Sequence, residues 1–157
     1  MAYQKLQGRR AIPVYPTDDI IIPSPGDKAD EGTTDANTAN KLVDSTALFL
    51  TKSIIPGATV YNTTTNAVAT VTNVDSNTTL SLSANIFAAQ PEGYAVYNTN
   101  NSEGPVLFVG TGGTLAITTV GGDTVQLTNV ANASFIPIMV KCVQATGTTA
   151  SGIIALW

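Results

Sequence analysis

Two glycine pairs lie close together in the stretch VGTGGTLAITTVGGDTVQL, residues 109–127. A glycine-rich loop that opens a helix can hold a phosphate on its backbone N–H groups. Here Leu115 occupies the place of the last glycine of a dinucleotide-binding loop, and no Lys-Ser/Thr pair follows as in a P-loop. The residues after each pair alternate and are β-branched. We therefore expect both pairs, at 112–113 and 121–122, to form hairpin turns.

Carboxylates are the second group that could support chemistry, and they are concentrated at Asp18, Asp19, Asp27, Asp30, Glu31 and Asp35. A glycosidase needs two carboxylates held at a fixed separation, and a calcium loop needs alternating ligands that end in a bidentate Glu. Neither spacing is present. Because the cluster follows a Pro-rich segment, we predict a solvated or partner-facing acidic loop, with a weak Ca²⁺ site as the alternative.

The chain has no histidine and one cysteine, Cys142. It therefore lacks the commonest general base, and it can form neither an intrachain disulfide nor a cysteine-based zinc site. Cys142 lies in an apolar run, which predicts a buried and inert thiol. A Ser-Lys pair is the one nucleophilic arrangement that the sequence leaves open. We expect no enzymatic activity, no metal and no cofactor.

The composition narrows the class of protein further. Of 157 residues, 43% are hydrophobic and 11% are charged, with a formal net charge of −4. This supports a substantial core but lacks the basic surface that nucleic acid requires. The longest apolar run, FIPIMVKCV at 135–143, is too short to cross a bilayer, and the first ten residues do not resemble a secretory signal. We predict a soluble protein without nucleic-acid or membrane partners.

Short alternating runs indicate an all-β fold. An arm and the first base strands, residues 1–37, carry four prolines between positions 13 and 25. Residues 38–99 contain strands of five to eight residues with turn signals such as DSN at 75–77, typical of a small barrel. Within this part, ALFLTKSII at 47–55 fits one helical turn or another strand. Residues 102–157 repeat the all-β pattern.

The last third of the chain is strongly apolar. From residue 104 onward only Asp123 and Lys141 are charged, and the strand candidates at 106–109, 134–143 and 153–157 are apolar on both faces. Such a surface would aggregate in a monomer, so burial against copies of the chain or another protein is the favoured interpretation.

Several motifs of this last third resemble one family. The first features are FVGTGG at 108–113 and GGDTV at 121–125, followed by Leu127 and NV at 129–130. The series IPI, VK, V and ATGTTA lies between 136 and 150, and IIALW is at 153–157. The early AIPVYPTDDIIIPSPG at 11–26 is also similar. Together they resemble the capsid decoration and head-spike base proteins of tailed phages and gene transfer agents. The resemblance covers about 75 residues in two blocks. The residues between them look like a separate small β module that is often embedded in phage structural proteins.

The resemblance implies a fold and a role. We expect an antiparallel β-sandwich or barrel base domain, residues 11–27 with 102–157, interrupted by an inserted barrel-like module at 38–99. The protein would be made in the host cytoplasm and bind the capsid exterior of the virion as a decoration or cement protein, or as a vertex spike base. Its partners would be the major capsid protein, further copies in a trimer or pentamer, and possibly a spike or fibre protein.

Two sets of contact residues follow from this expectation. The extended Pro-rich N-terminal arm would dock on the capsid through Arg9, Arg10, Ile12, Val14 and Tyr15, and the oligomer would form through Phe135, Ile138, Met139 and Trp157. Deleting residues 1–16 would then abolish capsid binding and leave the oligomer intact. The alternative is a tail, baseplate or fibre component whose module binds a host receptor or glycan through exposed Tyr61, Tyr94 and Tyr97, although packing between strands is the commoner use of such tyrosines.

Overall fold

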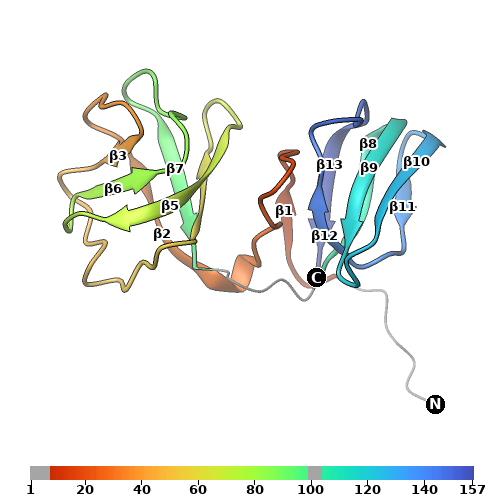
Figure 1. Cartoon of the computed structure of the whole chain (residues 1–157), viewed down its shortest axis with the longest axis horizontal. Helices are drawn as coiled ribbons and strands as arrows, with labels where there is room; N and C mark the ends of the chain where they lie inside the picture. Colours follow the sequence, from red (N-terminus) through yellow and green to blue (C-terminus); the bar gives the residue numbers. More distant parts are fainter. Residues whose placement is uncertain (1–7, 99–103) are drawn as a thin grey trace, which may run out of the picture. The chain divides into compact units, whose positions relative to one another are not determined.

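The computed structural model describes residues 8–98 and 104–157, and it confirms the all-β prediction. Every paired strand is antiparallel, and the described residues contain one short 3₁₀ turn, Pro25–Asp27, but no α-helix. No helix in this part of the chain is long and apolar enough to cross a membrane. The chain divides into two compact units: unit 1 takes Met1–Pro25 and Glu103–Trp157, and unit 2 takes Gly26–Ser102 (Figure 1).

Unit 1 contains two antiparallel sheets. The first has the order β1 (Ala11–Pro13), β13 (Ser151–Leu156), β8 (Val106–Thr111) and β11 (Ser134–Ile136). The second has the order β10 (Thr124–Val130), β9 (Gly113–Thr119) and β12 (Val140–Val143). Alternate residues of β8 and β13 and the middle of β9 are buried, so side chains from both sheets build the core.

The segment after β1 runs along unit 1 and closes one of its edges. The N–H of Val14 donates to the carbonyl of Ile153 in β13, at 2.9 Å. Thr17 and Ile22 then donate to the carbonyls of β12, each at 2.9 Å. The prolines of this segment keep it extended, and its hydrogen bonds cover the otherwise free edge of β12.

The two glycine pairs differ in their roles. Gly121 and Gly122 form the β9–β10 hairpin turn as predicted, with Gly122 at a φ of 93°. The expectation of a hairpin at the first pair is wrong, because β8 and β9 do not pair and belong to different sheets. A side chain at Gly112 would meet the carbonyl oxygen of Val130 at 2.1 Å. Glycine is therefore needed there for close backbone approach as the chain changes sheets.

Unit 2 is one six-stranded sheet that curls into a half-barrel (Figure 1). Its order is β2 (Lys28–Thr33), β7 (Gly93–Tyr97), β4 (Thr59–Asn62), β5 (Val68–Val74), β6 (Thr79–Leu82) and β3 (Lys41–Val43). The turn at 75–78 joins β5 to β6, as its sequence predicts. The buried core includes Leu42, Phe49, Leu80 and Phe87.

The segment between β3 and β4 forms a single helix-like turn, one of the two alternatives expected from its sequence, and not a strand. The N–H of Lys52 donates to the carbonyl of Leu48 at 2.8 Å, which is a single helix-like turn without a regular helix or strand. Phe49 points inward and is fully buried, whereas Leu48 and Leu50 are 48% and 55% exposed. The turn thus anchors its middle in the core and leaves two leucines at the surface.

Candidate interaction surfaces

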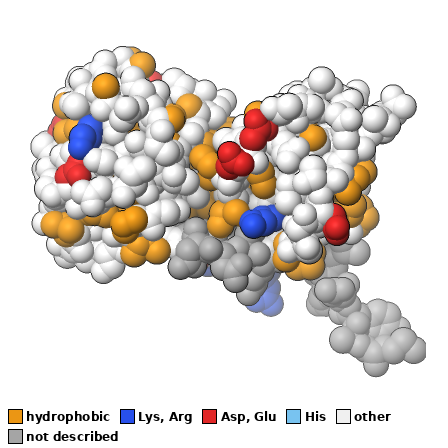
Figure 2. All heavy atoms as spheres, viewed as in Figure 1, with side chains coloured by type: hydrophobic (Ala, Val, Ile, Leu, Met, Phe, Trp, Pro, Cys, Tyr) orange, Lys and Arg blue, Asp and Glu red, His pale blue; other side chains and the backbone are white. Residues whose placement is uncertain are grey.

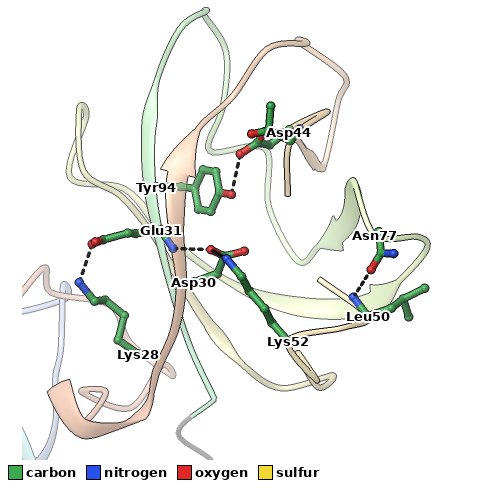
Figure 3. Close-up of polar contacts among 9 residues, drawn as sticks. Lys28, Asp30, Glu31, Asp44, Leu50, Lys52, Asn77 and Tyr94 are labelled. Carbon is green, nitrogen blue, oxygen red and sulfur yellow. Dashed lines mark hydrogen bonds and ion pairs between the residues drawn. The ribbon is translucent and has the colours of Figure 1, made fainter. Parts of the chain in front are cut away.

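Two residues of the acidic cluster lie in a strand and not in a loop. Asp30 and Glu31 belong to β2, and the side chain of Asp30 is only 2% exposed and forms an ion pair with Lys52 at 2.5 Å (Figure 3). The predicted loop is therefore wrong for both residues, because β2 pairs with β7. The predicted solvation is wrong for Asp30, whose charge Lys52 balances, whereas the side chain of Glu31 is 67% exposed. Across the described ranges, no three His, Cys, Asp or Glu side chains gather closely enough to hold a metal ion.

A second buried carboxylate, Asp44, joins two segments of unit 2. The Tyr94 hydroxyl donates to Asp44 at 2.8 Å, and the N–H and hydroxyl of Thr46 donate to it at 2.8 and 2.7 Å (Figure 3). Burial alone would raise the pKa of Asp44, but these hydrogen bonds outweigh burial and the pKa is lowered. A side chain at Gly32 would meet the Tyr94 hydroxyl at 2.7 Å, so glycine there makes room for this contact.

The tyrosines of unit 2 are not exposed. Tyr61, Tyr94 and Tyr97 are 4%, 2% and 7% exposed, and the rings of Tyr61 and Tyr97 pack edge to face with centroids 5.5 Å apart. The expectation that they present a glycan-stacking surface is therefore wrong. Packing across neighbouring strands is their role, because all three lie on β4 or β7 in the middle of the sheet.

Cys142 is buried, as predicted. Its thiol donates to the carbonyl of Thr17 at 2.9 Å. Burial, with a smaller contribution from Asp18 and Asp19, raises the pKa of the thiol to about 11. The thiol therefore stays protonated at neutral pH and is a poor nucleophile.

The outer face of the first sheet of unit 1 is apolar across all four strands. The register places Pro13, Ile154, Phe108 and Phe135 in one row, and Ala11, Leu156 and Val106 in the next. Gly110 and Gly152 continue the face where the two strands approach closely. Phe108 and Phe135 pack edge to face, with centroids 5.2 Å apart. We call this set of residues the apolar face.

Exposure distinguishes the apolar face from the core behind it. Phe135 is 62% exposed and Ile154 is 36% exposed, while their inward-facing neighbours Ile136, Ile153 and Leu107 are buried. No position on the apolar face carries a charged or hydrogen-bonding side chain. A sheet face of this kind can bind another protein surface without desolvating a charge.

The four residues expected at an oligomer interface do not all share one surface. Phe135 lies on the apolar face, whereas Ile138 and Met139, 37% and 52% exposed, lie in the segment between β11 and β12. The carbonyl of Met139 accepts the N–H of Val120 at 3.0 Å, which places this pair beside the β9–β10 hairpin. Trp157 is half-buried at the chain end, and its backbone hydrogen bonds to Arg9 and Arg10.

The five residues expected on a docking arm have different surroundings. The side chains of Arg9 and Arg10 are exposed, and Tyr15 is half-buried, with burial raising its pKa. Ile12 and Val14 are 9% and 6% exposed and belong to the core of unit 1. Alternation along β1 explains this difference, because every second side chain of an edge strand points into the sandwich. Deleting residues 1–16 would therefore remove part of the fold.

Some exposed apolar residues were not identified from the sequence. Leu48 and Leu50 are held in place because the side-chain oxygen of Asn77 accepts the N–H groups of Leu50 and Thr51 at 3.0 and 3.1 Å. Phe108 and Ile154 on the apolar face were also missed as individual contact residues. Alternation within their strands shows that Phe108 and Ile154 lie on one face of the sheet. It does not show whether that face is exposed, because both faces are apolar and their burial depends on how the sheets pack.

Comparisons with known proteins leave the family of this chain open. No family model, no curated protein and no solved structure matches it.

Proposed function

We propose that this chain is a non-enzymatic phage virion protein that binds the capsid exterior as an oligomeric decoration or cement protein, with a vertex spike base as a close variant. The apolar face of unit 1 is the observation that carries the proposal. A sheet that exposes Phe135 and Ile154 on either side of the half-buried Phe108 is suited to permanent association. The sequence motifs that resemble decoration proteins lie in the same unit.

The apolar face would join copies of the chain into a ring, and the N-terminal residues would contact the shell. Arg9 and Arg10 are exposed beside β1, so they are available to an acidic capsid surface, whereas Ile12 and Val14 are occupied in the core. Each copy then needs only a weak contact. Repetition of that contact around a symmetric oligomer gives strong attachment through avidity.

Unit 2 would be a second β module carried on the same chain as the base. Its edges carry charged residues, and its aromatic side chains are buried, so it offers less apolar surface than unit 1. Insertion of a folded module into a surface loop is inexpensive because the entropy of loop closure grows slowly with loop length.

The test is immunogold electron microscopy of intact particles from the source of this sequence, with serum raised against this chain. Label over the whole head supports decoration, and label at isolated vertices supports the spike-base variant. Label confined to the tail would contradict the proposal and favour a tail or fibre protein with a receptor-binding unit 2.

The contact residues can be tested separately with purified capsids. Arg9→Ala with Arg10→Ala should reduce capsid binding at least tenfold without changing the oligomer, because both side chains are exposed and outside the core. Lys28→Ala is the matched control on unit 2. Equal loss of binding with the control variant would contradict a docking role for the two arginines.

A further inference from the structure

Strand β10 is the one long strand at a sheet edge, among the described residues, that neither charge nor another segment protects. It has seven residues, TVQLTNV, and none is charged. Both edges of the unit 2 sheet carry charges, on β2 and β3. In unit 1, β1 and β11 have three residues each, and the edge of β12 is covered by hydrogen bonds from Thr17 and Ile22. Sheet proteins normally block such edges because they pair with other chains.

The backbone of β10 is available for pairing at Gln126. In the β9–β10 pair, Gln126 lies opposite Ala116. The N–H and carbonyl of Ala116 bond instead to Thr148 and Gln144, at 3.0 and 2.9 Å. Because hydrogen-bonded and non-hydrogen-bonded pairs alternate, the N–H and carbonyl of Gln126 point away from β9 toward the free edge.

The side chains of β10 also lack cover on the face that should be buried. Val125 and Leu127 lie opposite Ile117 and Leu115, which are fully buried core residues of β9. Val125 is nevertheless 40% exposed, and Leu127 is only partly buried. Hydrophobic side chains reach the surface on the side of unit 1 that carries β10 and β11 (Figure 2). The core of unit 1 is therefore open along this edge.

We propose that β10 pairs in antiparallel fashion with β10 of a second copy of this chain, centred on Gln126. This register places Val125 opposite Leu127 of the partner copy and Thr124 opposite its Thr128. Apolar side chains then meet on the inner face and threonines meet on the outer face, both of which are favourable pairs across strands. The open cores of the two copies become continuous.

The charge at the end of the strand favours this register. A shift by one residue in each copy would place Asp123 opposite Leu127, whereas centring on Gln126 keeps Asp123 outside the regularly paired part of the strand, away from the apolar pair of Val125 and Leu127. A parallel arrangement would bring the two Asp123 carboxylates together, and the antiparallel one keeps them about 20 Å apart. The bulge between Leu127 and Val130 limits regular pairing to the centre of the strand.

One strand edge is smaller than the roughly 800 Å² per partner of a typical stable interface. The pairing of two β10 edges is therefore expected to depend on the concentration of the chain. This edge is a different surface from the apolar face of the first sheet. The inference therefore does not rest on the proposed role at the capsid.

Cysteine cross-linking of the full chain tests the register. Gln126→Cys places two thiols opposite one another at a Cα separation of about 5.5 Å, within the range of a disulfide. Thr124→Cys is the matched control on the same strand and face, because its two copies would lie about 14 Å apart. Native Cys142 is buried and its pKa is raised, so it stays out of the reaction.

We expect disulfide-linked dimers for Gln126→Cys at least ten times more abundant than for Thr124→Cys under mild oxidation. In the background of Phe135→Asp, which removes the contact through the apolar face, Gln126→Pro should convert dimers to monomers in sedimentation experiments and preserve the fold, because it removes an N–H that points away from β9. Equal cross-linking of the two cysteine variants would overturn the proposed register. A Phe135→Asp chain that stays monomeric at tens of micromolar would overturn the pairing itself.

Discussion

The two units differ in how they protect the edges and faces of their β-sheets from solvent and from other chains. Unit 2 places charged residues on both edge strands and buries its three tyrosines, so its surface is that of a self-sufficient β module. Unit 1 leaves Phe135 exposed on a sheet face and leaves β10 uncharged at a sheet edge. Under the proposed function, this difference would reflect a demand for stability on the surface of unit 2 and a demand for association on unit 1.

The largest difference in stability is expected between alanine substitutions of two phenylalanines. Phe49 in unit 2 is fully buried and Phe135 in unit 1 is 62% exposed. Phe49→Ala should lower the free energy of unfolding of unit 2 by about 3–5 kcal/mol, because it leaves a cavity in the core. Phe135→Ala should cost less than about 1 kcal/mol in the dissociated protein. Urea unfolding followed by amide NMR separates the units, and similar losses from both variants would contradict the contrast.

Removing the lysines that pair with the carboxylates of β2 should have an intermediate effect on the free energy of unfolding. Lys52→Met leaves the buried carboxylate of Asp30 without its cation, so the free energy of unfolding of unit 2 should fall by about 1–3 kcal/mol. Lys28→Met is the matched control, because its partner Glu31 has a side chain that is 67% exposed and such pairs contribute at most about 1 kcal/mol. Thermal unfolding of both variants checks this order, and equal losses would argue against a structural role for Asp30.

The smallest effect on stability is expected when the pH is lowered. Hydrogen bonds from Lys41, Ser81 and Asn73 lower the pKa of Asp75 to about 2, and the pKa of Asp44 is lowered as well. Because an unfolded Asp titrates near 3.9, this stabilisation is complete above about pH 5 and is lost as pH falls toward 2. Among the described residues of unit 1, Asp18 is the one such carboxylate, and hydrogen bonds from Thr146 lower its pKa.

Unit 2 should therefore lose more stability than unit 1 between pH 5 and pH 2, and Asp75→Asn should flatten the profile of unit 2. Amide hydrogen exchange resolves the two units, and fluorescence of Trp157, the single tryptophan, reports on unit 1. A steeper acid dependence in unit 1 would contradict this assignment.

Much of the fold was accessible from sequence because short alternating runs and turn signals determine strands locally. The DSN turn at 75–77, the hairpin at 121–122 and the buried Cys142 followed from such local patterns. The sheet change at Gly112 did not, since a glycine pair looks the same in a hairpin and at a corner between sheets. The inward orientation of Asp30 was not predicted either, because it depends on the ion pair with Lys52, which lies 22 positions away in the sequence.

The surroundings of the predicted contact residues could also be inferred from the sequence only in part. Apolar residues on both faces of the strands near the C-terminus led to the prediction of an interface there, and Phe135, one of the four residues predicted for it, lies exposed on the apolar face. Ile12 and Val14 look like arm residues in sequence, but pairing of β1 with β13 turns them into the core. Which face of a strand is covered depends on partners far along the chain, so local patterns cannot assign it.

The central claim is that the chain associates through unit 1. Sedimentation velocity on three full-length proteins tests it: the wild type, Phe135→Asp on the apolar face, and Leu48→Asp as a control at a similarly exposed site of unit 2. We predict a trimer or larger assembly of the 16.2 kDa chain for the wild type and for Leu48→Asp, and two chains or fewer for Phe135→Asp. A monomeric wild type, or dissociation caused by Leu48→Asp and not by Phe135→Asp, would contradict the account.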